Sequence, residues 1–199
     1  MQKVSLKLLW LKMSNIYFTS DMHAYHRRIQ EFCPTTRKGK DWEEMSEILM
    51  QNLVSVLKPG DILYNLGDVA FQGKEFCHKV LERIAATGAE HHLILGNHDQ
   101  NIRKHQILRD FCTTVSSMKT TFIEKQMVVM CHFPMAHWES EETSFHLHGH
   151  CHGSYQADGH ILDVGIDNRP TGDMMPWTWE EVKRHMKTVK PKIGHHGAT

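Results

Sequence analysis

Leu95-Gly96-Asn97-His98-Asp99 is the segment around which the rest of this chain is arranged. The apolar run 92–95 predicts a buried strand that Gly96 ends, and three side chains able to bind metal or move protons follow at once. Folds of the α/β class place their chemistry at such strand ends, because rigid strands aim side chains at one crevice. A polar turn would explain this segment on its own. Four further clusters of the same kind along the chain favour a functional site.

The further clusters also follow runs of β-branched, aromatic or other apolar residues, which are typical of strands. The strands predicted from these runs span 15–19, 61–65, 127–131 and 145–148, and they lead to Asp21 and His23, to Asp68, to His132, and to His150 and His152. Side chains two apart in extended backbone point the same way, so Asp21 and His23 could hold one ion. A helix N-cap formed by Ser20 or Asp21 is the alternative there.

Helical periodicity separates the first three predicted strands. Apolar residues recur at helical spacing over 42–57 and again through Phe76, Val80, Leu81 and Ile84, which predicts two helices. The order strand, helix, strand, helix, strand favours parallel strands joined by right-handed crossovers. A third helix is predicted over 102–111, and short strands are predicted at 120–124, 127–131, 145–148 and 160–164, the first two joined by a hairpin turn. This pattern indicates an α/β (α+β) fold.

Length and composition limit the class of protein. The 199 residues suit one domain with a sizeable core. Lys plus Arg and Asp plus Glu both number 23, so the formal net charge is zero and argues against long-range steering towards nucleic acid or an anionic membrane. Histidine is enriched, with 17 residues. Five cysteines without a Cys-x-x-Cys pair fit a reducing compartment, and we expect a cytoplasmic protein without a membrane span.

Three segments are expected along the chain. Residues 1–13 carry an apolar patch interrupted by Lys7 and lack a small-residue cleavage site, so we interpret them as an edge element or an N-terminal extension and not as a signal peptide. Residues 14–182 are expected to form the domain. Residues 183–199 are polar, contain Pro191, and are expected to form a C-terminal tail that is mobile at its end.

The strand-end clusters supply more ligands than one metal ion can use. Their oxygen and nitrogen donors number seven and are Asp21, His23, Asp68, Asn97, His132, His150 and His152. Seven ligands would crowd a single ion, whereas two ions that share a carboxylate would not be crowded. The spacing of these residues leaves open how they would be divided between two ions.

The order of the motifs, Asp-x-His, Gly-Asp, Gly-Asn-His-Asp, His and Gly-His-x-His, resembles the calcineurin-like metallophosphoesterases. The flanking residues 20–26 and 147–150 are similar to those of small, single-domain bacterial and phage members. The resemblance covers roughly residues 14–179 and implies a four-layer α-β-β-α sandwich with a two-metal site at its loop-bearing edge. It further implies two ligand sets, which are Asp21, His23, Asp68 and His152 for one ion and Asp68, Asn97, His132 and His150 for the other.

Charge counting supports a phosphate ester as substrate. Two divalent ions, with manganese expected first and iron, zinc, nickel or cobalt as alternatives, would face only two carboxylates, so the site keeps a surplus of positive charge. We expect in-line attack on phosphorus by a metal-bridging hydroxide. His98 is expected to stabilise the transition state or protonate the leaving oxygen, and Asp99 is expected to orient His98. His26 and Arg169 are candidate substrate contacts, with surface roles as the alternative.

Several functions are compatible with these motifs. The short segment between His132 and His150 leaves little room for a cap domain, which tilts the expectation slightly towards a phosphodiesterase acting on nucleotides or nucleic-acid ends. A phosphomonoesterase or nucleotidase is the alternative within the same fold. A non-catalytic metal-binding interaction scaffold would be expected to have lost His98 or a ligand, and none is lost. A histidine-rich metal-binding protein without hydrolase activity predicts scattered histidines instead of donors at successive strand ends.

Overall fold

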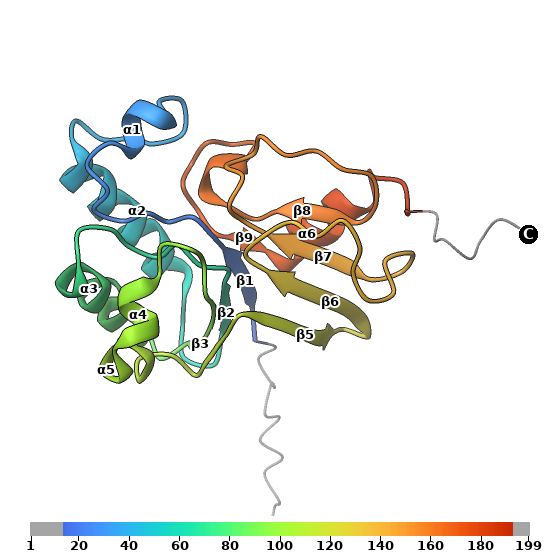
Figure 1. Cartoon of the computed structure of the whole chain (residues 1–199), viewed down its shortest axis with the longest axis horizontal. Coiled ribbons are helices and arrows are strands. Elements are labelled where there is room, and N and C mark those ends of the chain that lie inside the picture. Colours follow the sequence, from blue (N-terminus) through green and yellow to red (C-terminus); the bar gives the residue numbers. More distant parts are fainter. Residues whose placement is uncertain (1–13, 193–199) are drawn as a thin grey trace, which may run out of the picture.

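The computed structural model describes residues 14–192, so the expected N-terminal element 1–13 lies outside the described residues. Two sheets form its centre, one with the strand order β4-β3-β2-β1-β9 and one with the order β5-β6-β7-β8 (Figure 1). The first sheet comprises β1 Ile16–Thr19, β2 Ile62–Asn65, β3 Glu90–Ile94, β4 Thr114–Ser116 and β9 Trp177–Thr178. The second comprises β5 Met118–Ile123, β6 Gln126–Cys131, β7 Phe145–His148 and β8 Ile161–Asp163. This arrangement confirms the predicted fold class.

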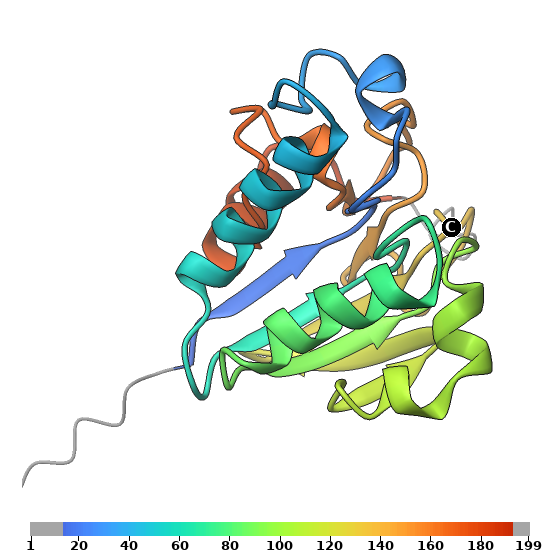
Figure 2. The same cartoon turned by 90° about the vertical axis from the view of Figure 1, so that its left-hand side faces the viewer.

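Helices cover the outer face of the first sheet (Figure 2). The helices of the described chain are α1 Ile29–Phe32, α2 Trp42–Val56, α3 Lys74–Ala85, α4 Gln100–Lys104, α5 Gln106–Arg109 and α6 Trp179–Met186. Of these, α2 and α3 pack on the outer face of the first sheet, whereas α6 packs against the core between the two sheets. The apolar stripes of α2 and α3 pack against strand residues such as Leu63 and Leu93, as their helical spacing predicted. Within residues 14–192, none of these helices is both long enough and apolar enough to cross a membrane.

A second core fills the space between the two sheets. Phe18, Tyr64 and Ile94 of the first sheet meet Val128 and Leu147 of the second in one buried cluster. Helix α6 joins this cluster through Trp179, Val182 and Met186. Its first turn is held by a capping box, in which the side chains of Thr178 and Glu181 bind each other's backbone amides. Trp177 and Trp179 are therefore core residues.

Parallel pairing brings the carboxyl ends of several strands to one edge. Strands β1 to β4 pair in parallel within the first sheet, and so do β6, β7 and β8 within the second. A bridge between Ser20 and Gly165 links the segments that follow β1 and β8. The loops that follow these strands therefore meet at the same end of the two packed sheets.

Some elements differ from the sequence-based prediction. The helix predicted over 102–111 is interrupted at His105, whose φ of −117° and ψ of 110° are extended, and forms the two short helices α4 and α5. Strands β4 and β9 were not predicted, because three and two residues are too few to show an alternating pattern. The first residues of the expected polar tail belong to α6, which continues to the buried Met186.

We expect the protein to lose stability in mild acid because His146 is buried as a neutral ring. Its Nε2 atom accepts a hydrogen bond from the Met135 amide, and its Nδ1 atom donates one to the Val129 carbonyl. Burial lowers the pKa of His146 to about 4, so between this value and about 6.5 the unfolded chain binds more protons than the folded one. The contribution of neutral His146 to the free energy of unfolding is thus complete above about pH 6.5 and decreases as the pH drops towards 4. At pH 5 this decrease is roughly 2 kcal/mol.

Urea unfolding at pH 7 and pH 5 in the presence of a chelator measures this loss. His146→Gln, which keeps a donor and an acceptor but does not titrate, should show a smaller loss than the wild-type protein. An equal loss in both proteins would mean that other groups cause the acid sensitivity.

Candidate metal centre

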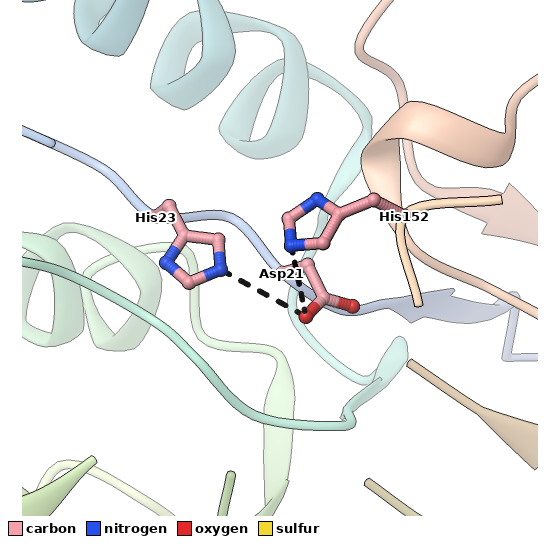
Figure 3. A group of neighbouring side chains, drawn as sticks. All are labelled: Asp21, His23 and His152. Carbon is pink, nitrogen blue, oxygen red and sulfur yellow. Dashed lines mark ion pairs between the residues drawn. The ribbon is translucent and has the colours of Figure 1, made fainter. Parts of the chain in front are cut away.

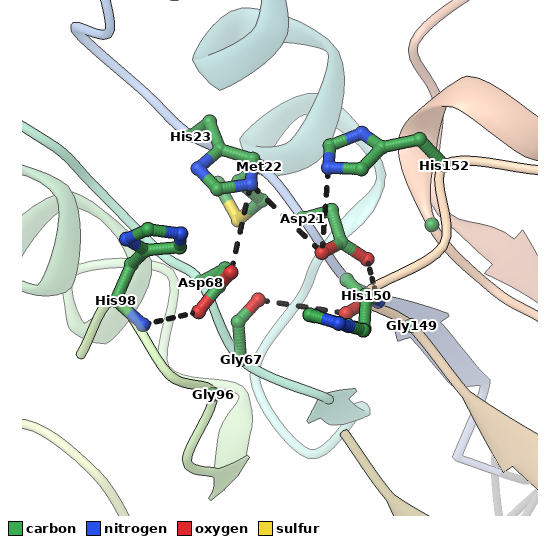
Figure 4. A network of polar contacts seen from close by, with 12 residues as sticks. Asp21, Met22, His23, Gly67, Asp68, Gly96, His98, Gly149, His150 and His152 are labelled. Carbon is green, nitrogen blue, oxygen red and sulfur yellow. Dashed lines mark hydrogen bonds and ion pairs between the residues drawn. The ribbon is translucent and has the colours of Figure 1, made fainter. Parts of the chain in front are cut away.

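The structure brings all seven predicted donors together at the shared edge of the two sheets. Figure 4 shows five of them, which are Asp21, His23, Asp68, His150 and His152. Asp21 and His23 follow β1, Asp68 follows β2, Asn97 follows β3, His132 follows β6, and His150 and His152 follow β7. Each donor thus lies in a loop that follows a strand, and the rigid strand fixes the position of the loop. His98 lies at the same place, with an exposed side chain.

One group of donors surrounds the carboxylate of Asp21 (Figure 3). Its Oδ1 atom lies 3.9 Å from Nε2 of His23 and 3.9 Å from Nε2 of His152. This oxygen is buried and has no hydrogen-bond partner among the described residues. A buried carboxylate oxygen without a donor is unfavourable unless a cation satisfies it, so this group fits a metal ion.

A second group of donors surrounds the carboxylate of Asp68. Its Oδ2 atom lies 3.6 Å from Nε2 of His23 and 3.5 Å from Nε2 of His132. Nδ1 of His132 donates to the carbonyl of Leu66, so its Nε2 atom can present a lone pair towards Asp68 and towards Oδ1 of Asn97, 3.1 Å away. Several acceptors facing one another need a positive charge between them, either a proton or a metal ion.

The electrostatics of the centre favour the binding of a cation. Burial raises the pKa of Asp21 to about 6 and lowers the pKa of His23 to about 3. Burial alone would also raise the pKa of Asp68, but the hydrogen bond and charge of His132 hold it below its usual value. His23 is therefore a neutral nitrogen donor, and the carboxylate of Asp21 is under-stabilised until a cation binds.

The loops that carry the donors are strained and closely packed. Positive φ angles occur at five of the seven donors, which are Asp21 (52°), His23 (42°), Asp68 (55°), His150 (71°) and His152 (48°). Such backbone at non-glycine residues costs roughly 1–3 kcal/mol each and is concentrated at functional sites. Glycines permit the close approach of the loops, since a Cβ atom on Gly96 would lie 2.2 Å from Asp68 Oδ1 and one on Gly149 would lie 2.4 Å from Asp21 Oδ2. Neither feature is visible in a sequence pattern.

Asp99 binds backbone instead of the His98 ring. Its carboxylate accepts hydrogen bonds from the amides of Asp68 (2.9 Å), Val69 (3.0 Å) and Gly96 (2.8 Å). Asp99 thus holds together the loops after β2 and β3, and it does not orient His98 as the sequence led us to expect. Among residues 14–192, the contacts of the His98 ring are with Phe71 and His23, at centroid distances of 4.9 Å and 5.5 Å.

The two candidate substrate contacts have different positions. His26 is half-buried and lines the same pocket as His23, Asp68 and His98. Arg169 is buried elsewhere, in ion pairs with Asp173 at 3.2 Å and Glu181 at 3.0 Å. The structure therefore does not bring Arg169 to the centre, and its expected role in substrate binding is corrected to bracing α6.

Sequence reasoning missed two residues that support the donors from behind. The fully buried guanidinium of Arg37 donates to the carbonyls of Asp21 and Met22 and forms a 2.7 Å ion pair with Asp167. Asp167 accepts a 2.7 Å hydrogen bond from Nδ1 of His152, which leaves Nε2 facing Asp21. Hydrogen bonds of this kind fix the ring orientation and raise the basicity of a histidine ligand. Arg37 and Asp167 lie far apart in the sequence and belong to no motif, so no sequence signal points to them.

Asp167→Asn is expected to weaken metal binding about 10- to 100-fold, because His152 loses its carboxylate partner. Isothermal titration of the metal-free protein with Mn²⁺ measures the affinity. Asp173→Asn is a matched control, since Asp173 is also paired with an arginine but touches no donor. Equal affinities in Asp167→Asn and wild-type protein would show that His152 needs no such support.

A cluster of oxygen and imidazole donors at the loop edge of two packed sheets is characteristic of metal-dependent hydrolases. The sequence profile of the calcineurin-like phosphoesterases matches residues 14–161. The chain belongs to this family of calcineurin-like phosphoesterases, which implies metal-dependent hydrolysis of phosphoesters.

Relatives in archaea and phages share most of the chain. A protein from Methanocaldococcus jannaschii is 26% identical over 145 residues, which cover 73% of each chain. The gene 66 protein of Mycobacterium phage L5 is 27% identical over 184 residues, with 78% of this chain and 87% of the phage protein covered. The crystal structure of an Aquifex aeolicus protein of unknown function is similar with a TM-score of 0.66 and 21% identity, covering 86% of this chain and 99% of that one. This last similarity concerns the fold alone.

Proposed function

We propose that this protein is a phosphodiesterase that uses two divalent cations, preferably Mn²⁺, which share the carboxylate of Asp68. The observation that carries the proposal is the position of Asp68 Oδ2, 3.6 Å from His23 and 3.5 Å from His132. One ion would be held by Asp21, His23, Asp68 and His152. The other would be held by Asp68, Asn97, His132 and His150. A single carboxylate between two donor sets is the arrangement that two neighbouring cations require.

The residues of the chain suit the hydrolysis of an anionic ester. Two bound divalent cations would lower the pKa of a water molecule and polarise the phosphoryl group. Among the seven donors only Asp21 and Asp68 are carboxylates, so the centre would keep a surplus of positive charge that attracts a phosphoryl group and stabilises the charge that builds up during its displacement. The exposed ring of His98, beside His23 and Phe71, is available to protonate the leaving oxygen.

Two observations favour diesters over monoesters. His98 and His150 are exposed, so the centre opens directly to solvent. In the segment between His132 and His150, Trp138 packs on Val129 and Ile161 of the second sheet, which anchors the middle of this segment to the sheet. An open centre accommodates a phosphate with an organic group on each side, whereas a phosphomonoesterase or nucleotidase remains the alternative within this family.

Hydrolysis assays test the proposal. Protein stripped of metal and reloaded with Mn²⁺ should hydrolyse bis-p-nitrophenyl phosphate with a higher kcat/KM than p-nitrophenyl phosphate. The same assay after reloading with Fe²⁺, Zn²⁺, Ni²⁺ or Co²⁺ compares the activity with these metals. Inactivity towards both esters with every metal would contradict the proposal. A higher kcat/KM for the monoester would replace the phosphodiesterase by the phosphomonoesterase.

We also propose that the protein works in a reducing compartment such as the cytoplasm. All five cysteines are free thiols. Cys33 lies 3.8 Å from Nδ1 of His152, and Cys151 lies between two donors in the sequence. Unpaired thiols so close to the centre are kept intact where the surroundings are reducing.

A further inference from the structure

A second cavity continues from the candidate metal centre. It has a volume of about 610 Å³ and lies between α1 and the loop after β7, where Ile29, Phe32, Cys33, His150, Cys151, His152 and Ser154 line it. Four of these residues also line the smaller pocket that contains His23, Asp68 and His98. The two spaces therefore form one cleft, with the donors at one end and the larger cavity at the other. We call the larger part the side cavity.

Phe32 lines the side cavity on the side of α1. Its side chain is 59% exposed, although it lies at the end of α1 beside half-buried rings. The ring of His26 meets it edge-on at 6.1 Å, and the guanidinium of Arg28 lies over it at 5.1 Å. A large aromatic ring left open to solvent at the mouth of a catalytic cleft is suited to stacking against a flat ligand.

The other residues that line the side cavity favour an uncharged part of a ligand over a cationic one. None of its lining residues is Lys, Arg, Asp or Glu. An ammonium group would therefore find no carboxylate among these residues, and the guanidinium of Arg28 lies beside the cavity, over the ring of Phe32. Ile29 and the thiols of Cys33 and Cys151 add apolar surface, and the hydroxyl of Ser154 adds one hydrogen-bonding group. The volume is within the range of pockets that hold a ligand of nucleoside size, roughly 300–1,000 Å³.

We propose that the side cavity binds a flat aromatic arm of the substrate, of nucleobase size, and that Phe32 determines specificity by stacking on it. The inference rests on the proposed function, because it assumes that the ester phosphate lies at the donor cluster. It adds that the substrate is the phosphate ester of a nucleoside or a similarly sized aromatic alcohol, and that esters of purely aliphatic alcohols bind less tightly.

Phosphonates that cannot be hydrolysed as esters isolate the contribution of the ring. Phenylphosphonate and propylphosphonate carry the same charged group and differ in the aromatic ring, and 5′-deoxyadenosine 5′-phosphonate carries a nucleobase on a nucleoside joined to phosphorus by a C–P bond. Isothermal titration of each into the Mn²⁺-loaded protein measures binding without turnover. We expect wild-type protein to bind 5′-deoxyadenosine 5′-phosphonate most tightly and propylphosphonate most weakly.

Phe32→Ala should weaken the two aromatic probes by roughly tenfold, in line with the effect of removing a ring that stacks on a base, and should leave propylphosphonate within twofold. Phe122→Ala is the matched control. Phe122 is 64% exposed and pairs with Met127 at the start of β6, the opposite end of that strand from His132. Both side chains are exposed, so neither substitution should unfold the protein, and thermal unfolding verifies this.

Two results would overturn the inference. If the Phe32→Ala variant binds all three probes with wild-type affinity, Phe32 does not stack on the ligand. If wild-type protein binds propylphosphonate as tightly as the aromatic probes, the side cavity does not prefer an aromatic ring. Either result can occur while the protein still hydrolyses bis-p-nitrophenyl phosphate, in which case the proposed function stands. If the protein binds none of the phosphonates and hydrolyses neither ester, the result contradicts the proposed function and not the side cavity alone.

Discussion

Asp68→Asn is expected to lower kcat/KM for phosphodiesters about 10³-fold or more, since a single electrostatic contributor to catalysis is typically worth about 10²–10³-fold and Asp68 would serve two ions. The amide keeps the size of the side chain and can still accept the 2.8 Å hydrogen bond from the His98 amide. It removes the negative charge between His23 and His132. Steady-state kinetics with saturating Mn²⁺, together with a manganese titration of the metal-free protein, measure both losses.

Asp61→Asn provides the matched control for this substitution. Asp61 is also a buried carboxylate next to β2, but it lies at the start of the strand, where it binds the amides of Asn15 and Lys58. This variant should lose stability and retain its affinity for Mn²⁺. If Asp68→Asn binds manganese as tightly as wild-type protein, Asp68 is not a shared ligand.

The second large effect is expected for His98→Ala. Loss of a general acid lowers kcat by about 10²–10⁴-fold. Metal affinity should be unchanged, because the contact of His98 with Asp68 is made by the backbone amide, which alanine keeps. Kinetics measure kcat, and elemental analysis measures the metal content of the same sample.

His160→Ala serves as the control, since His160 is a half-buried histidine that packs on Phe145, away from the donors. It should leave both kcat and metal content close to those of wild-type protein. If the His98→Ala variant loses metal, His98 is a metal ligand. If its kcat is unchanged, His98 takes no part in catalysis.

The sequence was informative wherever chemistry follows a regular element. Strands β1, β2, β3, β6 and β7 were recognisable from their apolar runs, so the donors were predicted at strand ends. The resemblance of the motifs to a known family implied that these donors share one edge, and the parallel pairing in each sheet explains why they meet there. Strand β9 and the break at His105 were not recognisable, because two residues show no period and one extended residue leaves the apolar pattern of a helix intact.

The supporting residues were the harder part to predict. Asp99 is next to His98 in the sequence, but its carboxylate turns back towards three amides of the loops after β2 and β3. Arg37 and Asp167 meet only because the segments before α2 and after β8 fold over the same donors. Arg169 was a candidate substrate contact with a surface role as the alternative, yet burial and two acidic partners give it a structural task. Such contacts depend on the direction of side chains in three dimensions, which spacing along the chain does not encode.

Electron paramagnetic resonance of the Mn²⁺-loaded protein tests the central claim most directly, because two manganese ions that share a carboxylate are magnetically coupled. We predict a coupled spectrum at full loading, which Asp68→Asn converts into the spectrum of isolated ions. A spectrum of isolated Mn²⁺ in fully loaded wild-type protein would contradict a pair of cations held together by Asp68.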